Sequence, residues 1–448
     1  MAGVEMGAAF WTATAIFVVS YVLIITEKVH KTVAALFGGA LMMALGILSQ
    51  REAFNAEDLG VDWNVIFLLI SMMIIVNLAK PTGLFEYIAI RSAKLGGGRP
   101  FRIMAVLAVV TALLSALLDN VTTVLLIIPV TMFVADELET DPVPFLLAEA
   151  FASNIGGTAT LIGDPPNIMI ASKAGLDFMQ FIYNLAPIIA IIMAAFVPMM
   201  WLMFGRKLRS TAEVRARVMA MDERAAIKDP VLLRKSLFVL GLVTAGFVFH
   251  GAMGYQPATV ALLGAGFLLL ITNTKDTHRV LAAVEWPTVF FFIGLFIIVG
   301  GVVKVGLIRW MSAQAIALTH GDLFGTSMLV MWFSAFASSI IDNIPFVATM
   351  NPLVIDMAHQ LWPDRAGPEL LNHVALMPVW WSLALGACLG GNGTAIGASA
   401  NVIVVGMSEE AGRKISFVRF MAYGMPVMLM TLVLSTLYVW LRYYVLHI

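Results

Sequence analysis

The folds open to this chain are limited most by a series of apolar stretches, each long enough to cross a lipid bilayer. A hydrocarbon core of about 30 Å needs roughly 20 helical residues. The stretches lie at 9–26, 32–49, 63–80, 180–204, 236–252, 257–273, 287–303 and 418–440. Only 12% of the residues are charged, against about 25% in a soluble domain. Because unpaired backbone groups are not tolerated in lipid, the sequence predicts an all-α polytopic membrane protein.

An acid–amide pair occurs once in each half of the chain, both times in an apolar setting: Asp119-Asn120 and Asp342-Asn343. An Asp at the centre of a spanning helix costs roughly 2.5–3.5 kcal/mol, so two at equivalent places predict an ion or proton site. Neither pair has a charged flank that could reach water, which predicts re-entrant hairpins whose tips carry capping Asp or Asn side chains. The predicted tips are 119–123 and 342–345.

The two halves of the chain resemble each other. Residues 63–120 align with 286–343 without a gap, at an offset of 223 (342 − 119 = 223), and later positions align at an offset of 234 (401 − 167 = 234). This predicts two inverted repeats, 1–204 and 236–448, joined by the linker 205–235. Each repeat is expected to hold about five spanning helices, a re-entrant hairpin and a broken helix. An odd number of crossings inverts the second repeat relative to the first.

Each half also has a polar, glycine-rich segment, at 154–167 and at 390–401. Its glycines allow the chain to turn, the prolines of the first segment remove N–H donors, and Thr, Ser and Asn supply neutral oxygen ligands. The pattern predicts a broken helix in which bared carbonyls suit Na⁺. The N-terminus of the following half-helix suits an anion or a neutral, oxygen-rich solute.

The candidate binding residues are the polar and glycine positions of these four segments. They are Asp119, Asn120, Thr122, Thr123, Asn154, Gly156, Gly157, Thr158, Thr160, Asp164, Asn167, Asp342, Asn343, Asn392, Thr394, Ser399 and Asn401. Asp119, Asp164 and Asp342 are also the candidates for proton coupling, because a carboxyl group removed from water binds a proton more readily. Asp164 has no acidic counterpart, since Ala398 occupies its place in the second half. No Lys or Arg lies in the four segments, which argues against a substrate with fixed negative charge.

Structural roles compete with these functional ones. The tip acids could be N-caps alone, and the paired glycines could serve close helix packing. Glu149 is expected near a helix start, satisfied at the membrane interface, and Lys304 is expected to extend to the interface from a helix end. Cys388 is the one cysteine, which excludes a disulfide or a thiolate cluster within a single chain. No metal site is therefore predicted.

The distribution of charge predicts the orientation in the membrane. The segment 205–235 holds nine basic residues against four acids, so the positive-inside rule places it in the cytoplasm. Lys28 and Lys31 mark a second cytoplasmic loop. Both termini are then expected outside, with the protein integral to the cell (inner) membrane. The net charge of −1 gives no indication of a nucleic-acid partner.

The hairpin tips and the runs 154–160 and 163–167 together resemble the ArsB/NhaD branch of the ion transporter superfamily. The resemblance is nearest to its P-protein-like permeases, with an arsenite-efflux or citrate-transporter-like domain. It implies the fold of divalent-anion/sodium symporters, in which a transport domain moves like an elevator against a scaffold. Homodimers are frequent among relatives with this fold.

The resemblance also implies ligand roles for the asparagines of the tips. The residues so implied are Asn120 and Asn343 as direct ligands, with Thr160, Asn167, Thr394 and Asn401 closing the site. Dicarboxylate carriers of this fold have Ser-Asn-Thr at each tip, whereas Asp precedes Asn here. A carboxylate in place of a hydroxyl favours a cation, a proton or an uncharged solute.

The function favoured by these observations is proton-coupled export of arsenite or antimonite as neutral hydroxides. The alternatives are a Na⁺/H⁺ antiporter and a sodium-coupled or anion carrier. No enzymatic activity is expected, and no cofactor beyond H⁺ or Na⁺ as coupling ion; the partners are a small inorganic ion or metalloid and the lipid bilayer. A channel would show a ring of like residues. An intramembrane aspartyl protease would need Gly where Leu161 occurs.

Overall fold

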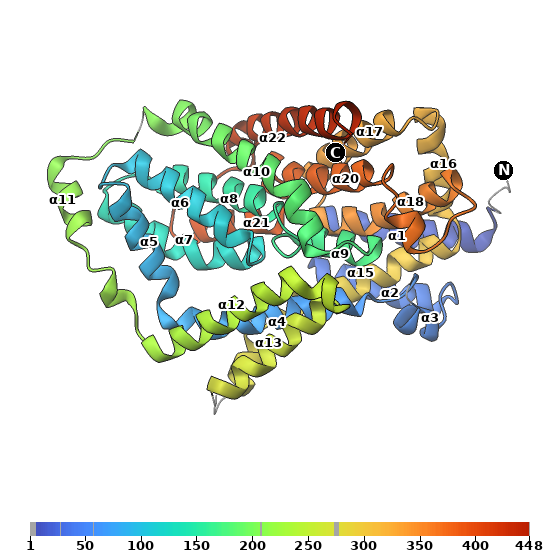
Figure 1. The fold of residues 1–448 in the computed structure, drawn as a ribbon, viewed down its shortest axis with the longest axis horizontal. Coiled ribbons are helices and arrows are strands. Elements are labelled where there is room, and N and C mark those ends of the chain that lie inside the picture. Colours follow the sequence, from blue (N-terminus) through green and yellow to red (C-terminus); the bar gives the residue numbers. More distant parts are fainter. Residues whose placement is uncertain (1–5, 27, 57, 207, 273–276, 448) are drawn as a thin grey trace.

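The computed structural model describes residues 6–26, 28–56, 58–206, 208–272 and 277–447, and within these ranges the chain forms helices and loops without a strand (Figure 1). Eight helices of the described part are long and apolar enough to cross a membrane. The predicted all-α polytopic class is thereby confirmed. The described ranges do not include Lys207 of the basic linker. They also do not include residues 1–5 and 448, the two ends of the chain that the sequence predicts to lie outside the cell.

The helices of the first half run from α1 to α10. They are α1 (Ala8–Thr26), α2 (Lys31–Ala44), α3 (Gln50–Asn55), α4 (Trp63–Ala79), α5 (Leu84–Leu95), α6 (Pro100–Ser115), α7 (Asn120–Glu137), α8 (Val143–Gly157), α9 (Pro165–Ala174) and α10 (Phe178–Met200). A π-helical turn, Trp201–Gly205, extends α10, and Lys80–Thr82 forms a 3₁₀ turn after α4.

The second half follows α11 (Ala212–Ala220) and the 3₁₀ turn Arg224–Ala226. Its helices are α12 (Pro230–Met253), α13 (Pro257–Thr272), α14 (Thr277–Ala282), α15 (Trp286–Lys304), α16 (Leu307–Thr319), α17 (Leu323–Ile340), α18 (Asn343–Leu361), α19 (Pro368–Leu371), α20 (Met377–Gly390), α21 (Ser399–Glu410) and α22 (Phe417–Val439). The 3₁₀ turn Gly391–Gly393 follows α20, and the π-helical turn Trp440–Val445 extends α22.

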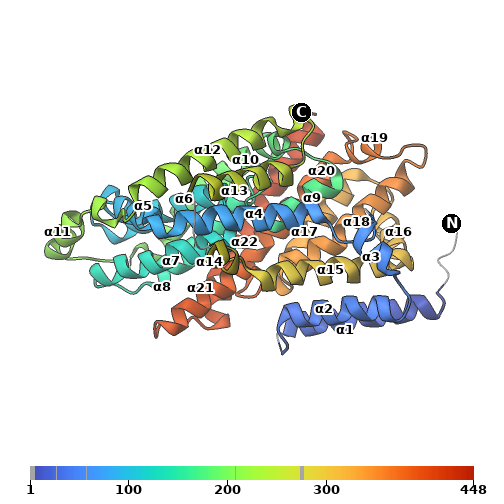
Figure 2. The same ribbon diagram turned by 90° about the horizontal axis from the view of Figure 1, so that it is seen from below.

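Helices of each half pack against the other half. In Figure 2, α1 and α2 lie beside α15, while α12 and α13 pack against α4. The α2–α15 contact depends on glycine, because a Cβ on Gly294 would lie 2.4 Å from the carbonyl carbon of Ala35. Small residues allow helix backbones in a membrane to approach this closely. Neither half could therefore bury these helix faces alone.

Two helices begin or end several residues away from the predicted apolar stretches. The helix predicted within 32–49 ends at Ala44, since the chain turns there and Ser49 forms a capping box with Glu52 at the start of α3. The last six positions of the predicted linker 205–235 belong to α12. Asp229 caps that helix and Pro230 takes its first position, where no N–H donor is needed.

The chain leaves the helices near the predicted tips and breaks, over shorter turns than predicted. Asp119 and Asp342 are N-caps, so the residues that follow them already belong to α7 and α18. The turns without helix are 116–119 and 341–342, and the breaks are 158–164 and, after the 3₁₀ turn, 394–398. Capping explains the difference, because a side chain that accepts N–H groups allows the helix to begin one residue later.

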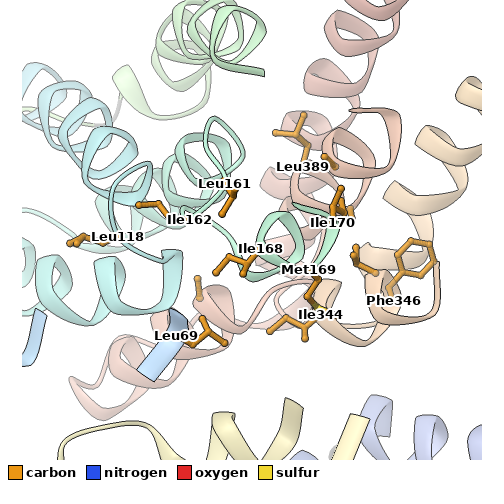
Figure 3. Packing of buried hydrophobic residues seen from close by; sticks show 14 of the residues in the cluster. Leu69, Leu118, Leu161, Ile162, Ile168, Met169, Ile170, Ile344, Phe346 and Leu389 are labelled. Carbon is orange, nitrogen blue, oxygen red and sulfur yellow. The ribbon is translucent and has the colours of Figure 1, made fainter. Parts of the chain in front are cut away.

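Apolar side chains surround the place where tips and breaks converge. Figure 3 shows Leu118 before one tip and Ile344 after the other, together with Leu161, Ile162 and Ile168 around the first break. All five are buried. Hydrogen bonds among polar groups enclosed in this way are stronger than they would be in water, and an unpaired polar group there is costly.

Candidate functional site

Asparagine side chains join the two halves at the centre of the molecule. Asn154 on α8 donates from Nδ2 to Oδ1 of Asn392 and to Oδ1 of Asn401, both at 3.0 Å. Its own Oδ1 accepts from Asn120 Nδ2 at 3.2 Å. All four side chains are buried. One tip and both breaks are therefore held by one amide network.

Two further asparagine contacts use the carbonyls of the breaks. Asn167 Nδ2 donates to the carbonyls of Thr158 and Thr160, at 3.2 and 2.9 Å. Asn401 Nδ2 donates to the carbonyl of Thr394 in the second break, at 2.9 Å. The sequence predicted bared carbonyls that could bind Na⁺. In this conformation these carbonyls already accept from amides, because each asparagine lies in the first turn of the helix that follows the break and its side chain folds back over the break.

The threonine hydroxyls of the breaks bond to backbone. Thr160 Oγ1 donates to Ala116 O and Thr394 Oγ1 donates to Ser339 O, each at 2.5 Å. These bonds tie each break to the hairpin of its own half. Thr158 Oγ1 donates within its own helix, to Asn154 O at 2.7 Å.

The glycines of the first break are required by packing. A Cβ on Gly156 would lie 2.1 Å from Ala112 O, and one on Gly157 would lie 2.4 Å from Gly163 O. Real Cβ atoms do not approach backbone this closely. Close helix packing, the structural role that competes with ligand binding, thus accounts for Gly156 and Gly157 in this conformation.

The three predicted acids take different roles. Asp119 accepts from the backbone N of Thr122 at 2.8 Å and from its Oγ1 at 2.5 Å, as an N-cap does. Asp342 caps α18 through Ile344 N at 3.2 Å. Asp164 also occupies an N-cap position, yet its side chain makes no capping bond to described residues. Both of its oxygens accept instead from Asn343 Nδ2, at 3.2 Å. Asp164 lies within electrostatic range of Asp119 and Asp342.

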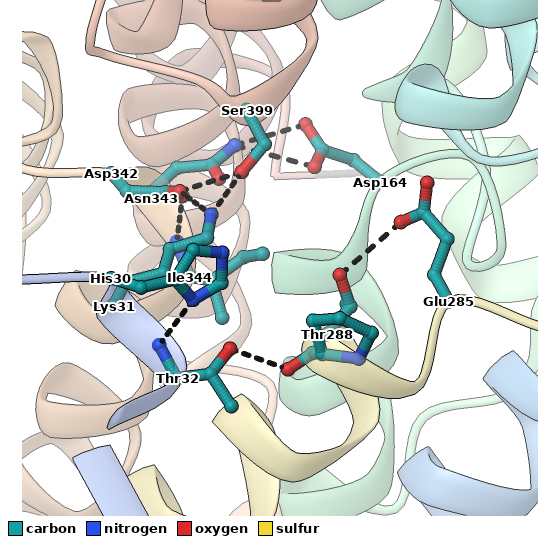
Figure 4. Close-up of polar contacts among 11 residues, drawn as sticks. His30, Lys31, Thr32, Asp164, Glu285, Thr288, Asp342, Asn343, Ile344 and Ser399 are labelled. Atoms are coloured by element: carbon teal, nitrogen blue, oxygen red, sulfur yellow. Dashed lines mark hydrogen bonds and ion pairs between the residues drawn. The ribbon is translucent and has the colours of Figure 1, made fainter. Parts of the chain in front are cut away.

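A basic side chain reaches these acids from outside the predicted segments. Lys31, the first residue of α2, donates from Nζ to Asp342 Oδ2 at 2.9 Å and to Ser399 Oγ at 2.7 Å (Figure 4). Ser399 Oγ in turn donates to Asp342 Oδ2 at 2.6 Å. The sequence had placed Lys31 in a cytoplasmic loop. Leu36 and Gly38 align with Leu262 and Gly264 at an offset of 226 (264 − 38 = 226), which makes Pro257 the counterpart of Lys31, so the internal repeat gave no signal for it.

Glu285, just before α15, is a second residue that sequence reasoning missed. It lies within electrostatic range of Asp119 and Lys31, and its Oε2 accepts from Thr288 Oγ1 at 3.2 Å. A signal was present, because the aligned position in the first half is also an acid, Asp62 (285 − 62 = 223). We call the group formed by these charged residues the acidic junction. It comprises Asp119, Asp164, Glu285, Asp342 and Lys31.

Some polar atoms beside the acidic junction remain free to bind a ligand. Asn392 Nδ2 and Thr123 Oγ1 are buried and have no hydrogen-bond partner in the described chain. The single thiol, Cys388 Sγ, lies 3.5 Å from Asn167 Oδ1. Because buried polar groups are normally paired, the free donor of Asn392 and the hydroxyl of Thr123 mark places that suit an oxygen-bearing ligand.

Comparison with known proteins places the chain in a family. The CitMHS family, described as citrate transporter, matches residues 21–386. The chain belongs to this citrate transporter family. An uncharacterized transporter of Mycobacterium tuberculosis is 48% identical to this family member over 97% of this chain and 99% of the relative. Human P protein is 34% identical over 95% of this chain, which spans 59% of the P protein.

Two solved transporter structures are similar in fold to this citrate transporter family member. MtrF of Neisseria gonorrhoeae, described as one of a class of antimetabolite efflux pumps, matches with a TM-score of 0.58 at 10% identity, over 99% of this chain and 96% of MtrF. The YdaH transporter of Alcanivorax borkumensis matches with a TM-score of 0.54 at 12% identity, over 97% and 98%. Such identities show the fold alone, and the fold is that of a transporter.

The comparisons refine the predicted resemblance. The kinship with P-protein-like permeases is confirmed at the level of the citrate transporter family, and this family is one of membrane carriers. They show the citrate transporter family, and the ArsB/NhaD branch that the motifs suggested stays a prediction.

Proposed function

We propose that this citrate transporter family member is a secondary active transporter that exchanges protons for a cation at the acidic junction. The observation that carries the proposal is Asp164. It is buried, it is free of any capping role within the described structure, and its one side-chain partner amide, Asn343, comes from the tip of the other half. A carboxyl group in this setting can bind a proton or a cation in turn, because each neutralises the same charge.

The charge of the acidic junction supports one class of solute over the others. Four carboxyl groups and one lysine form the acidic junction, so a cation such as Na⁺ gains more there than a bare polycarboxylate would. Na⁺/H⁺ antiport is therefore the mode that we favour. Lys31 is the group at which a carboxylate could bind, and it is already paired with Asp342.

A second candidate rests on the neutral polar atoms beside the acidic junction. Asn392 Nδ2 has no partner among the described residues, and Cys388 is the one thiol nearby. Three thiolates around arsenic cannot come from one chain, so an arsenite or antimonite cargo would be a neutral trihydroxide held by amides. Under this candidate Cys388→Ser keeps transport, and loss of transport in that variant would exclude it.

The proposed cycle uses the packing of the two halves. Hairpins α6–α7 and α17–α18 and the two broken helices form the moving part, while α1, α2, α4, α12, α13 and α15 form the scaffold. Lys31 on α2 then bridges scaffold and moving part through Asp342. Protonation of Asp342 breaks this ion pair and frees the tip. The basic linker faces the cytoplasm in this proposal, with both termini outside.

The test is transport by the purified protein in proteoliposomes that contain a pH-sensitive dye. An imposed Na⁺ gradient should move protons in the opposite direction, and Asp164→Asn should abolish this movement. Asp136→Asn, at an exposed position on α7, is the matched control and should transport normally. Parallel gradients of arsenite and citrate identify the competing cargoes. Citrate uptake without any cation-driven proton movement would overturn the proposal.

A further inference from the structure

A carboxyl group lies buried outside the acidic junction. Glu149 is the seventh residue of α8 and is 1% exposed, so the expectation of a residue satisfied at the membrane interface is wrong. Its Oε1 accepts from Thr131 Oγ1 at 2.6 Å. Its Oε2 is buried without a hydrogen-bond partner anywhere in the part of the chain that the structure describes.

No charge is placed to stabilise an ionised Glu149. Its hydrogen-bond partner in the described structure is the Thr131 hydroxyl, and no basic side chain of the described chain forms an ion pair with it. The helices packed against α8 carry further ionisable residues, and none of these forms a hydrogen bond or an ion pair with Glu149 in the described chain. They are Arg102 on α6, Asp136 and Glu137 on α7, Tyr183 on α10, Cys388 on α20, Glu409 and Glu410 on α21, and Arg419, Tyr423 and Tyr438 on α22. An isolated buried carboxylate is costly, whereas a bound proton removes the charge.

The second half shows that packing does not require this acid. Leu383 is the seventh residue of α20, as Glu149 is of α8, and Val354 occupies the position of Thr131 (354 − 131 = 223). Leu383 and Val354 are fully buried. An apolar pair thus fills the equivalent place, so the acid and the hydroxyl in the first half must serve another purpose.

The position of Glu149 links it to the acidic junction. Asn120 and Thr131 on α7 contact Asn154 and Glu149 on α8, so the two helices are antiparallel and Glu149 lies farther from the tip. Asn154 comes five positions after Glu149, which is about 7.5 Å along a helix. On α7, Thr123 lies between Asn120 and Thr131. Its hydroxyl has no hydrogen-bond partner within the described residues.

A second unpaired hydroxyl lies on α6, which packs against α8. Ser115 Oγ donates to Ser153 O at 2.8 Å, which sets the level at which α6 meets α8. Thr111 directly precedes Ala112, whose carbonyl lies against Gly156, so Thr111 lies nearer the first break than Glu149 does. Thr111 Oγ1 is buried and lacks a partner in the described chain. Hydroxyls can both donate and accept, so Thr111 and Thr123 can pass a proton on.

We infer that Glu149 is a second proton-binding site, which relays protons between the acidic junction and the far end of the α7–α8 pair. Its ligand is the proton itself, held on Oε2 while Oε1 accepts from Thr131. Each relay step moves one proton between oxygens and changes no other bond. This inference rests on the proposed proton coupling at Asp164 and adds the route by which protons arrive.

Two measurements test the relay. The infrared spectrum of the lipid-embedded protein should show the carbonyl band of a protonated carboxyl that disappears in Glu149→Gln and persists in Asp136→Asn. In proteoliposomes, Glu149→Gln should lose proton-driven transport while it keeps exchange of labelled for unlabelled cation without a pH gradient. Asp164→Asn should lose both activities.

A double variant removes the acid while the protein is expected to stay folded, so that a loss of transport is not mistaken for misfolding. Thr131→Val with Glu149→Leu copies the buried pair of the second half and should be at least as stable as the original protein, because apolar replacement of buried polar pairs often is. Proton-driven transport at the original rate in Glu149→Gln or in the folded double variant would overturn the relay while leaving the proposed function intact. Absence of proton movement in the unmodified protein would overturn the proposed function, and the relay with it.

Discussion

The side-chain amide of Asn343 lies 3.2 Å from each carboxylate oxygen of Asp164, so the tip of the second hairpin is bonded to the first break. Ala398 takes the place of Asp164 in the second half, at the N-cap position of α21. The contact therefore exists once, although the elements around it occur twice. The charge on Asp164 and the position of the second tip are thereby linked.

Changing Asn343 to Asp should make stability depend on pH. The new carboxyl group would face Asp164, and two like charges so close cannot both ionise without repulsion. One of them keeps its proton in the folded state, so the variant should lose stability as pH rises. The unfolding temperature measured from acidic to alkaline buffer checks this. Asn64→Asp, at an exposed position on α4, should show no such slope; an equal slope in both variants would contradict the prediction.

Changing Lys31 to Met should destabilise the second tip. Asp342 and Ser399 would lose their shared partner, at a cost of about 1–3 kcal/mol for a partly buried group. Hydrogen exchange at 338–345 should then accelerate. Adding Asp342→Asn should restore part of the loss, since Asn still caps a helix and carries no charge. Lys28→Met, at an exposed position in the same loop, is the control and should leave exchange unchanged.

The sequence predicted the tips and breaks because their signals are local. Asp119 and Asp342 act as caps within three residues of their own positions, and glycines mark the places where helices meet. Capping also explains why the turns are shorter than predicted, since in the sequence a capping residue looks like part of the loop. The limits of the two repeats, and the binding roles of the candidate residues, stay predictions.

Lys31 could not be placed in the same way. Lys31 bonds to Asp342 across 311 positions of the chain, and neither the period of an apolar helix nor a cap motif encodes such a distance. The amides of Asn154, Asn167 and Asn401 were recognised as polar groups, but their partners depend on how α8, α9 and α21 pack. Pairing of donors and acceptors is a property of the folded molecule.

The ion pair between Glu52 and Lys304 should give the α3–α15 contact a pH dependence. Lys304 Nζ donates to Glu52 at 2.7 Å, and this bond, with those from Ser49, lowers the pKa of Glu52 from 4.5 to about 2. A lowered pKa means that the pair stabilises the fold fully above pH 4.5 and is lost as the pH falls toward about 2. Glu52→Gln should therefore be less stable than the original protein near neutral pH, and the difference in unfolding temperature should vanish in acid. A difference that stays constant across that range would show that Glu52 acts through packing alone.

Adding a methyl group at Gly156 should disrupt the meeting of hairpin and broken helix. The Cβ of Gly156→Ala would lie 2.1 Å from Ala112 O, and backbone cannot move aside as a flexible side chain can. Overpacking of this kind costs about 1–3 kcal/mol or more, so the unfolding temperature should fall and transport should be lost. Gly406→Ala on α21 is the matched control, because its Cβ meets no described atom within 4 Å, and replacing a helical glycine should raise stability by up to about 1 kcal/mol. Normal stability and transport in Gly156→Ala would mean that α6 and α8 lie farther apart than they do in this conformation, and the carboxyl of Asp164 would then be less enclosed than the proposed coupling requires.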